Sequence, residues 1–269
     1  MSAGSVPAGV LLTVAYDGAR YGGYARQSNA RTIAGELWGA ITAIDAKASD
    51  LRGASRTDAG VHARGQLVAF DAQRVIEPRS WALGLAGHLP AEICVVRAAR
   101  VPAGYDPRRH ALRKVYRYVL LRSQVRDPFW SERCWRVGYR LNHQLMQQEA
   151  ALLLGRHDFA AFRSSSDDRD NTVRTIFRAD VSEDACDPRV LNIVIEGDRF
   201  LHRMVRIIAG TLVDVGRGRL RPGAVTRGLS SRSRLDLGMT APAGGLCLER
   251  VHVDDAGTDA WPPDDLGGD

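Results

Sequence analysis

The chain has 269 residues, 45% hydrophobic and 25% charged, with a formal net charge of +6. This composition is typical of a globular protein with one large or two small domains, and it excludes a wholly disordered chain. No apolar run approaches the roughly 20 residues that span a bilayer, and the start lacks a leader pattern, so the sequence predicts a cytoplasmic protein without membrane attachment.

Hydrophobic periodicity predicts six elements in the first part of the chain, in the order strand, helix, strand, strand, helix, strand. Alternation of apolar and polar residues, clear in Gln66–Asp71, is typical of a strand, and apolar residues every three or four positions are typical of a helix. The elements are expected at Gly9–Tyr16, Thr32–Ala46, around Leu51, Gln66–Asp71, Pro78–Leu89 and Ile93–Val101.

The second part of the chain repeats the same order of elements. A repeated β-α-β-β-α-β order is typical of ferredoxin-like modules, a pattern shared by RNA-binding modules. We therefore expect an α+β fold of two such halves, each with a largely antiparallel sheet and helices packed on one face. The elements of the second half are expected at Lys114–Leu121, Asn142–Leu154, Thr175–Ser182, Val190–Gly197, Arg203–Gly216 and Leu246–Val253.

This pattern predicts an N-terminal domain over residues 9–104 and a C-terminal domain over residues 105–253. Residues 1–8 are expected to be flexible, and residues 254–269 to form a disordered acidic tail. The loop 102–110 joins the halves and either is a plain linker or reaches RNA. The hydrophilic stretch 164–171 is expected to be a surface loop whose acidic residues argue against a strong phosphate site.

Positive charge is concentrated in the body of the chain. Six aspartates lie in residues 254–269, which contain no Lys or Arg, and without them the chain carries +12. Only Lys47 and Lys114 are lysines, so nearly all the positive charge is arginine, which suits bidentate phosphate contacts and stacking on bases. A genome-wide preference for arginine codons explains the ratio equally well, but not the net excess. Arginine clusters that favour a nucleic-acid partner occur at Arg108-Arg109, Arg113-Lys114, Arg203/Arg206 and 217–221.

Cysteine and histidine spacing gives no metal-binding pattern. The four cysteines are far apart, and no paired-carboxylate or His-Glu motif is present. We therefore expect no metal ion.

The run Ala54-Ser55-Arg56-Thr57-Asp58-Ala59-Gly60-Val61-His62 places one carboxylate, that of Asp58, in a short loop between two predicted strands. Asp58 and Gly60 tolerate the backbone angles of a tight connection. Arg56 and His62 add charged and hydrogen-bonding groups, suited to hold an ionised carboxylate or a polyanion. An ordinary aspartate-containing turn is the competing interpretation.

This run resembles the catalytic loop of the tRNA pseudouridine synthase A family, Gly-Arg-Thr-Asp-Ala-Gly-Val-His, with Ser55 in place of the first glycine. Further motifs similar to those of the family follow in order, over about Leu12 to Val253. Tyr24 stands where the family has tryptophan, which keeps an aromatic ring there. The motifs are Tyr16-Asp17-Gly18 with Tyr21-Gly22-Gly23-Tyr24 and Arg26-Gln27, Lys114-Val115-Tyr116-Arg117-Tyr118, Phe159-Ala160-Ala161-Phe162-Arg163, Phe200 to Arg206 with Gly210, and Ala241 to Leu248.

The resemblance implies isomerisation of uridine to pseudouridine on the 3′ side of the tRNA anticodon stem-loop, at positions 38, 39 and 40, by a homodimer without a cofactor. It implies that Asp58 is the nucleophile, attacking either C6 of uracil or C1′ of ribose. The target nucleotide has to leave the stack, and Arg56 is suited to brace the vacated position. A simple phosphate contact is the alternative role for Arg56.

Three further residues are implied to bind the substrate. Tyr116 stacks on or orients the uracil, although Tyr116 and Tyr118 share a strand face and a core role competes. Arg206 would lie beside the catalytic aspartate and favour its ionised form, or else bind a phosphate at the surface. Leu246 would form an apolar wall or an ordinary core position. Arg108 and Arg109 are further candidates for tRNA contact.

Two other classes of function are compatible with the sequence. A non-catalytic RNA-binding protein or chaperone with two RNA-binding modules would show the same basic surface. A glycosidase or N-glycosylase usually requires a second placed carboxylate, and the loop around Asp58 offers none.

Overall fold

The computed structural model describes residues 8–262 of the chain, which divide into two units. Unit 1 contains the residues up to Leu112 and those from Leu248 onward, and unit 2 is Arg113–Cys247. The chain therefore enters unit 2 near the start of one strand and returns near the start of another. This division differs from the expected 9–104 and 105–253, because the last predicted strand joins the sheet of unit 1.

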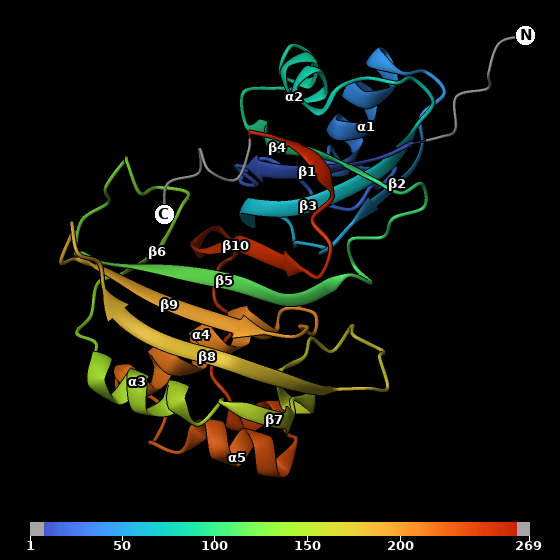
Figure 1. Cartoon of the computed structure of the whole chain (residues 1–269). Helices are drawn as coiled ribbons and strands as arrows, with labels where there is room; N and C mark the ends of the chain where they lie inside the picture. The colour runs from blue at the N-terminus through green and yellow to red at the C-terminus, as the bar shows by residue number, and fades with distance from the viewer. Residues whose placement is uncertain (1–7, 263–269) are drawn as a thin grey trace, which may run out of the picture. The chain divides into compact units, whose positions relative to one another are not determined.

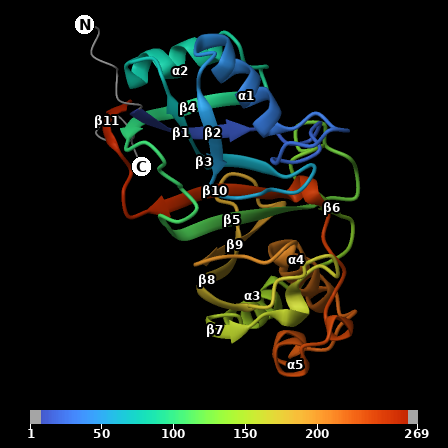
Figure 2. The same cartoon turned by 90° about the vertical axis from the view of Figure 1, so that its right-hand side faces the viewer.

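Unit 1 is a largely antiparallel sheet in the order β11-β4-β1-β3-β10, with β2 paired to β3. Helices α1 and α2 lie together on one face of β1, β3 and β4 (Figures 1 and 2). The order β-α-β-β-α-β is confirmed. The elements are β1 (Ala8–Tyr16), α1 (Ile33–Ile44), β2 (Ser49–Gly53), β3 (His62–Ala72), α2 (Pro78–Ala86), β4 (Ile93–Val101), β10 (Leu246–Val253) and β11 (Thr258–Trp261).

Unit 2 has the strand order β5-β9-β8-β7, with β6 added in parallel to β5. Helix α3 packs against β8 and α4, and α5 packs on α3 and α4. The strand, helix, strand, strand, helix order of β5, α3, β8, β9 and α4 is the predicted one, and the sixth predicted strand is β10 of unit 1. The elements are β5 (Ala111–Arg122), β6 (Trp135–Val137), α3 (His143–Ala151), β7 (Gly155–Asp158), β8 (Val173–Glu183), β9 (Val190–Gly197), α4 (Met204–Gly216) and α5 (Ala224–Ser231).

Local sequence explains where the helices begin and what the sheets bury. Thr32 caps α1, because its hydroxyl accepts a hydrogen bond from Gly35 N at 3.2 Å, and Asn142 caps α3 in the same way. In unit 1, Phe70 on β3 meets Trp81 on α2 edge-to-face at 5.0 Å, and both side chains are fully buried. The apolar faces of helix and sheet thus form the core of the unit.

The segment from Asp254, expected to be disordered, is held in unit 1 as far as Trp261. Tyr105 donates a hydrogen bond to Asp255 O and stacks on His110, whose ring contacts Asp254. Thr258–Trp261 then pairs with β4 as strand β11. Backbone pairing at an open sheet edge requires no apolar periodicity, which is why the sequence pattern did not reveal this strand. Of residues 1–8, expected to be flexible, Ala8 is instead the first residue of β1, where it pairs with Ala72. Residues 1–7 and the end of the tail, 263–269, lie outside the described residues.

Asp71 on β3 forms hydrogen bonds both to the neighbouring strand β2 and to the loop 102–110. It accepts hydrogen bonds from both terminal nitrogens of Arg52, at 2.9 and 2.6 Å, and from Gly104 N at 2.9 Å. The Arg52 guanidinium holds the pKa of Asp71 below its usual range, against the opposing effect of burial. A lowered pKa in the folded state means that ionised Asp71 stabilises the fold above the usual carboxyl pKa and that this stabilisation is lost as the pH falls.

We expect Asp71→Asn to lower the free energy of unfolding at pH 7 by about 2 kcal/mol, because a charged, bidentate hydrogen bond is lost. The difference from wild type should begin to shrink as the pH falls below about 4, where the Asp71 carboxyl of the unfolded chain becomes protonated, and should keep shrinking until the pH passes the lowered pKa of Asp71 in the folded protein. Denaturant unfolding at pH 7 and pH 3 measures both values, with the exposed Asp170→Asn as the control. A difference that is the same at both pH values would contradict the assigned role.

Candidate active site

The loop that carries Asp58 joins β2 to β3 and is fixed to the sheet where it begins. Ala54 N donates to Leu67 O at 2.8 Å. The fully buried amide of Gln66 then bonds both backbone groups of Ser55: Oε1 accepts from Ser55 N at 3.1 Å, and Nε2 donates to Ser55 O at 2.7 Å. The exchange of the family's glycine for Ser55 therefore leaves the backbone path held by a paired amide clamp.

Thr57, next to Asp58, is held on its own two sides. Its carbonyl accepts from Tyr24 N at 3.1 Å, and its hydroxyl lies 2.8 Å from the Tyr16 hydroxyl. After Asp58 the chain turns back, with Val61 N donating to Asp58 O at 3.1 Å and Gly60 at φ +79°. Gly60 takes this left-handed conformation without steric cost. The half-buried Asp58 thus stands in a loop whose backbone has little freedom.

Two glycines of the opening motif lie directly against this loop. A Cβ on Gly18 would stand 2.0 Å from Val61 O, and a Cβ on Gly23 would stand 2.8 Å from Thr57 O. Gly23 also has φ +103°, which side-chain-bearing residues rarely adopt. The segment 17–24 and the loop 54–62 therefore pack backbone to backbone. This contact shows how the opening motif and the Asp58 loop, which are far apart in the sequence, together form one part of unit 1.

His62 supports the loop rather than pointing away from it. Gly18 N donates to His62 Nδ1 at 3.2 Å, and Asp17 Oδ1 lies 3.1 Å from the same nitrogen. The side chain is buried. His62 therefore serves hydrogen bonding between the loop and the segment 17–24.

Tyr24, at the position of the family's tryptophan, is buried with its ring against Gly53. Its hydroxyl has no hydrogen-bond partner among the described residues, and burial raises its pKa well above the usual value. The ring therefore acts as an apolar support for β2 next to the loop.

Arg56 is exposed and makes no hydrogen bond or ion pair with the described residues. It precedes the buried Thr57 and lies two residues before Asp58 in the fixed loop. Its guanidinium is therefore available to an external anion or a nucleobase.

In unit 2, Tyr116 lies on β5 and Phe200 meets it edge-to-face at 5.0 Å. Tyr116 is 6% exposed, so the structure gives it a largely buried place. Tyr118, two residues further along the same strand, is fully buried and donates from its hydroxyl to Pro242 O at 2.8 Å. This agrees with a core role for Tyr118.

Arg206, in the first turn of α4, is joined to the Ala-Pro-Ala-Gly-Gly segment. Its Nε donates to Ala241 O at 2.9 Å, and Ala241 N donates to Arg206 O at 3.0 Å. A 3-10 turn, Ala243–Gly245, then leads to Leu246 at the start of β10, where the side chain is buried. Two motifs far apart in sequence thus form one connected piece of unit 2.

In the loop 164–171, expected to be a surface loop, Asp167 forms hydrogen bonds that hold the loop together. Asp167 is buried and accepts from Arg169 Nε at 2.7 Å and from His202 N at 2.8 Å. The Arg169 guanidinium holds the pKa of Asp167 well below its usual range. The acidic charge at Asp167 is therefore balanced within the loop and attached to the segment that leads into α4.

The remaining candidates lie in the loop 102–110 of unit 1. Arg108 and Arg109 are both exposed. The Arg109 guanidinium lies 3.7 Å from the Asp106 carboxylate, Arg109 N donates to Asp106 O at 3.0 Å, and Arg108 N donates to Asp106 Oδ1 at 2.9 Å. The loop is thus shaped by Asp106 and presents two guanidinium groups to solvent.

From the sequence alone, no role in fixing the loop was assigned to Gln66, or to Tyr16 of the Tyr16-Asp17-Gly18 motif. The available signals were the polar Gln66 in an otherwise apolar strand and the presence of Tyr16 in a motif. Over residues 8–262, no helix is long and apolar enough to cross a membrane. The same residues contain no cluster of three or more His, Cys, Asp or Glu side chains arranged to hold a metal ion.

Comparison with known proteins gives a family and several relatives. The model of a family described as tRNA pseudouridine synthase matches residues 12–108 and 150–254. A protein named tRNA pseudouridine synthase A from Citrifermentans bemidjiense is 39% identical to this chain, over 90% of this chain and 96% of the relative. A protein of the same name from Myxococcus xanthus is 40% identical, over 91% of each chain. The relative from Halalkalibacterium halodurans is 41% identical over 90% of this chain and 91% of its own.

A solved Cbf5-Nop10-Gar1 complex aligns with 91% of this chain and 50% of the solved chain. The TM-score is 0.37 and the identity 10%, too low a similarity to equate the two folds.

Proposed function

The chain belongs to the tRNA pseudouridine synthase family, and from that membership we propose that it converts uridine to pseudouridine in tRNA with Asp58 as the nucleophile. The observation that supports this role best is the position of Asp58, a half-buried carboxylate in a loop held by Gln66, Tyr24 and Tyr16. A nucleophile gains from such preorganisation, because the reacting groups need little further ordering.

The reaction is an isomerisation and balances without an added reactant. The glycosidic bond between C1′ and N1 breaks, uracil turns while still bound, and C1′ bonds to C5. The hydrogen on C5 leaves as a proton and N1 gains one. A carboxylate assists either by attacking uracil C6 or by attacking ribose C1′. Both routes use the same atom of this chain, a carboxylate oxygen of Asp58.

Arg56 is proposed to occupy the place that the target nucleotide leaves when it flips out of the stack. Its exposed guanidinium, two residues from Asp58 and unpaired with the described residues, supports this role.

We expect Arg56→Lys to keep RNA affinity and its salt dependence while lowering the single-turnover rate by at least about tenfold, because lysine keeps the charge but not the planar head. Arg56→Gln should lose affinity as well. A lysine variant with the wild-type rate would show that Arg56 is only a phosphate contact.

Tyr116, Arg206 and Leu246 are proposed as substrate-binding residues. The contact between Tyr116 and Phe200 fixes the tyrosine ring, and the bonds between Arg206 and Ala241 fix the guanidinium stem. An aromatic ring supplies a stacking surface for a base, and a guanidinium supplies charge for a phosphate or carboxylate. Arg108 and Arg109 are proposed as further tRNA contacts.

We propose the 3′ side of the anticodon stem-loop as the target, a homodimer as the working form and the cytoplasm as the location. The test is to incubate the protein with an unmodified tRNA transcript and map pseudouridine along it. Pseudouridine confined to that segment, and absent when its uridines are replaced by cytidine, is expected. Pseudouridine elsewhere would contradict the proposed target, and none at all would contradict the activity.

The alternative of a non-catalytic RNA-binding protein is not favoured by the family or by the names of the relatives. It predicts RNA binding without turnover, which the same mapping detects.

A further inference from the structure

Unit 2 contains a pocket of about 580 Å³ that none of the proposed substrate-binding residues lines. It lies between the end of β5, the segment Val137–Leu141 after β6 and the turn between β8 and β9, and its lining includes Arg122, Tyr139, Arg140 and Arg189. Three guanidinium groups and one phenol around a single pocket are an arrangement suited to an anion.

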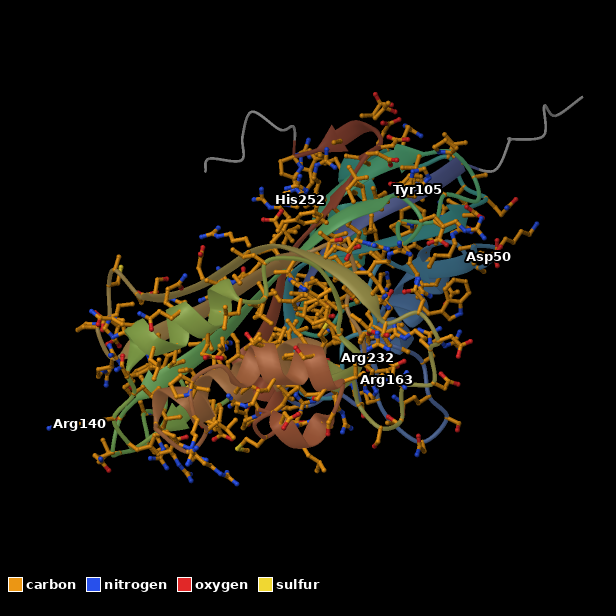
Figure 3. The ribbon with its side chains drawn as sticks, turned by 90° about the horizontal axis from the view of Figure 1, so that it is seen from below. Asp50, Tyr105, Arg140, Arg163, Arg232 and His252 are labelled. Carbon is orange, nitrogen blue, oxygen red and sulfur yellow. The ribbon has the colours of Figure 1, made fainter. Side chains whose placement is uncertain are left out.

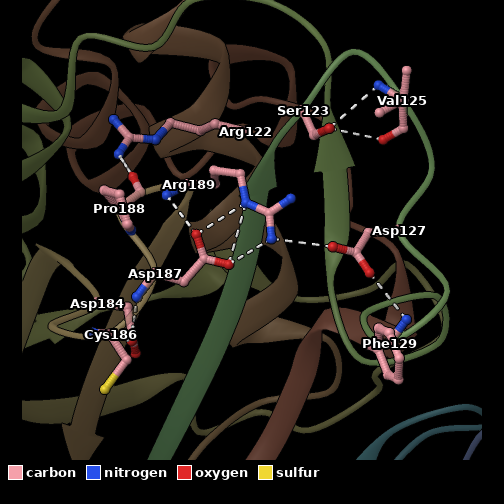
Figure 4. Close-up of polar contacts among 10 residues, drawn as sticks. All are labelled: Arg122, Ser123, Val125, Asp127, Phe129, Asp184, Cys186, Asp187, Pro188 and Arg189. Atoms are coloured by element: carbon pink, nitrogen blue, oxygen red, sulfur yellow. Dashed lines mark hydrogen bonds and ion pairs between the residues drawn. The ribbon is translucent and has the colours of Figure 1, made fainter.

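Two of these arginines build the pocket wall. Arg189 pairs with Asp187 at 2.8 Å and with Asp127 at 3.1 Å, which ties the β8–β9 turn to the loop after β5 (Figure 4). Arg122 bonds Glu183 at 2.7 Å and also Pro188 O. Both charges are therefore balanced, and their contribution is to fix the shape of the wall.

The charge around Tyr139 is not balanced in this way. Arg217 lies 5.0 Å over the ring of Tyr139 and 2.6 Å from Asp214. Arg219 is 62% exposed and 3.9 Å from the same carboxylate, so one buried aspartate serves two guanidinium groups. Arg140 is exposed and has no hydrogen bond or ion pair with any described residue.

The end of α4 explains only part of this cluster. Cations at a helix C-terminus interact favourably with the helix dipole, which explains Arg217 and Arg219 just beyond Gly216. Arg140 comes from a different segment, attached to this helix end by Asn142 N donating to Gly216 O at 2.9 Å. The fold thus brings an additional unpaired charge to a place that already has an excess.

This cluster is well separated from Arg206. Gly216 follows Arg206 by ten residues along α4, which is about 15 Å at 1.5 Å per residue. Arg163 lies near the start of α4, because the next residue, Ser164, donates from its N to His202 O. Figure 3 labels Arg163 and Arg140 at opposite ends of unit 2. An RNA that reaches both ends of α4 contacts the cluster with nucleotides other than those at Arg206.

We propose that Tyr139, Arg140, Arg217 and Arg219 form a second RNA-binding surface, which binds phosphodiester groups of the tRNA outside the stem-loop that holds the target uridine. This inference rests on the proposed tRNA substrate. Arginine suits it because the planar guanidinium binds phosphate oxygens in pairs, and the tyrosine hydroxyl and ring add a hydrogen bond or a stacking face.

The test compares the double variant Arg140→Gln, Arg219→Gln with a control of equal charge change, Arg79→Gln, Arg156→Gln, which removes two exposed arginines from α2 and β7. Binding of full-length tRNA and of the isolated anticodon stem-loop is measured against salt concentration. For the test variant we expect the slope of log K against log salt for tRNA to fall by about 1.5, since each phosphate contact contributes about 0.7 to 0.9. Stem-loop binding and its single-turnover rate should stay at the control values.

Three outcomes would overturn the inference. The first is a tRNA slope of the test variant that equals that of the control, and the second is an equal loss of affinity for tRNA and stem-loop. The third is a sedimentation measurement in which the Arg140→Gln, Arg219→Gln variant has a different oligomeric state from wild type. A failure of the proposed function is distinguishable, because wild-type protein would then form no pseudouridine while the binding slopes could still be compared.

Discussion

Replacing Asp58 by asparagine should reduce pseudouridine formation by more than about 1000-fold while leaving RNA affinity close to wild type. Asparagine matches the shape of aspartate but lacks the negative charge and nucleophilic oxygen that the reaction requires. The loop should keep its path, because the Gln66 and Tyr24 bonds that hold it end on backbone atoms of Ser55 and Thr57. Single-turnover rates at saturating RNA, followed by nucleoside analysis, measure the effect.

RNA binding by the Asp58→Asn variant serves as the control, since the basic surface dominates affinity. A variant that binds normally and still forms pseudouridine at the wild-type rate would remove Asp58 from the mechanism. A variant that loses binding and activity together would indicate a structural role for the loop aspartate.

Gly18→Ala should be the most damaging small substitution near the site. A Cβ there would lie 2.0 Å from Val61 O, a backbone atom that cannot move without shifting the turn around Asp58. We expect the free energy of unfolding to fall by about 3 kcal/mol, and the single-turnover rate of the folded fraction to fall with it. Denaturant unfolding and rate measurements on the same preparation check both effects.

Gly39→Ala is the matched control for this substitution. Gly39 lies inside α1, and a Cβ added to it would have no neighbouring atom within 4 Å among the described residues outside its own helix turn. Alanine there should stabilise the protein by up to about 1 kcal/mol and leave the rate unchanged. Equal stability changes for the two variants would contradict the close packing of segment 17–24 on the loop.

The order of the main elements could be predicted because each carries a clear apolar period. Helix α1 buries Ile33, Leu37, Ala40 and Ile41 at helical spacing, and on β5 the buried Tyr116 and Tyr118 alternate with less buried neighbours, which is what such a period reports. Strands β6, β7 and β11 are three or four residues long, too short to show a period. They depend on backbone pairing with a neighbour, which sequence alone does not display.

In the candidate site, the residues proposed to react with or bind RNA could be predicted from the sequence, but the contacts that hold their loop in place could not. Asp58 and Arg56 were recognisable because a short motif places both in one loop. The clamp by Gln66 and the hydroxyl pair of Tyr16 and Thr57 were not, since both contacts join residues from different strands or loops. Asp167 shows the same limit, because only the fold reveals that its charge is balanced by Arg169.

Release of tritium from C5-labelled uridine in an anticodon stem-loop RNA is the decisive measurement of whether the Asp58 carboxylate carries out uridine isomerisation. We expect release by the wild-type protein, one tritium per pseudouridine formed, and none by Asp58→Asn at equal RNA occupancy. Equal release by both proteins would contradict the role of Asp58, and release of free uracil in place of pseudouridine would contradict the isomerisation.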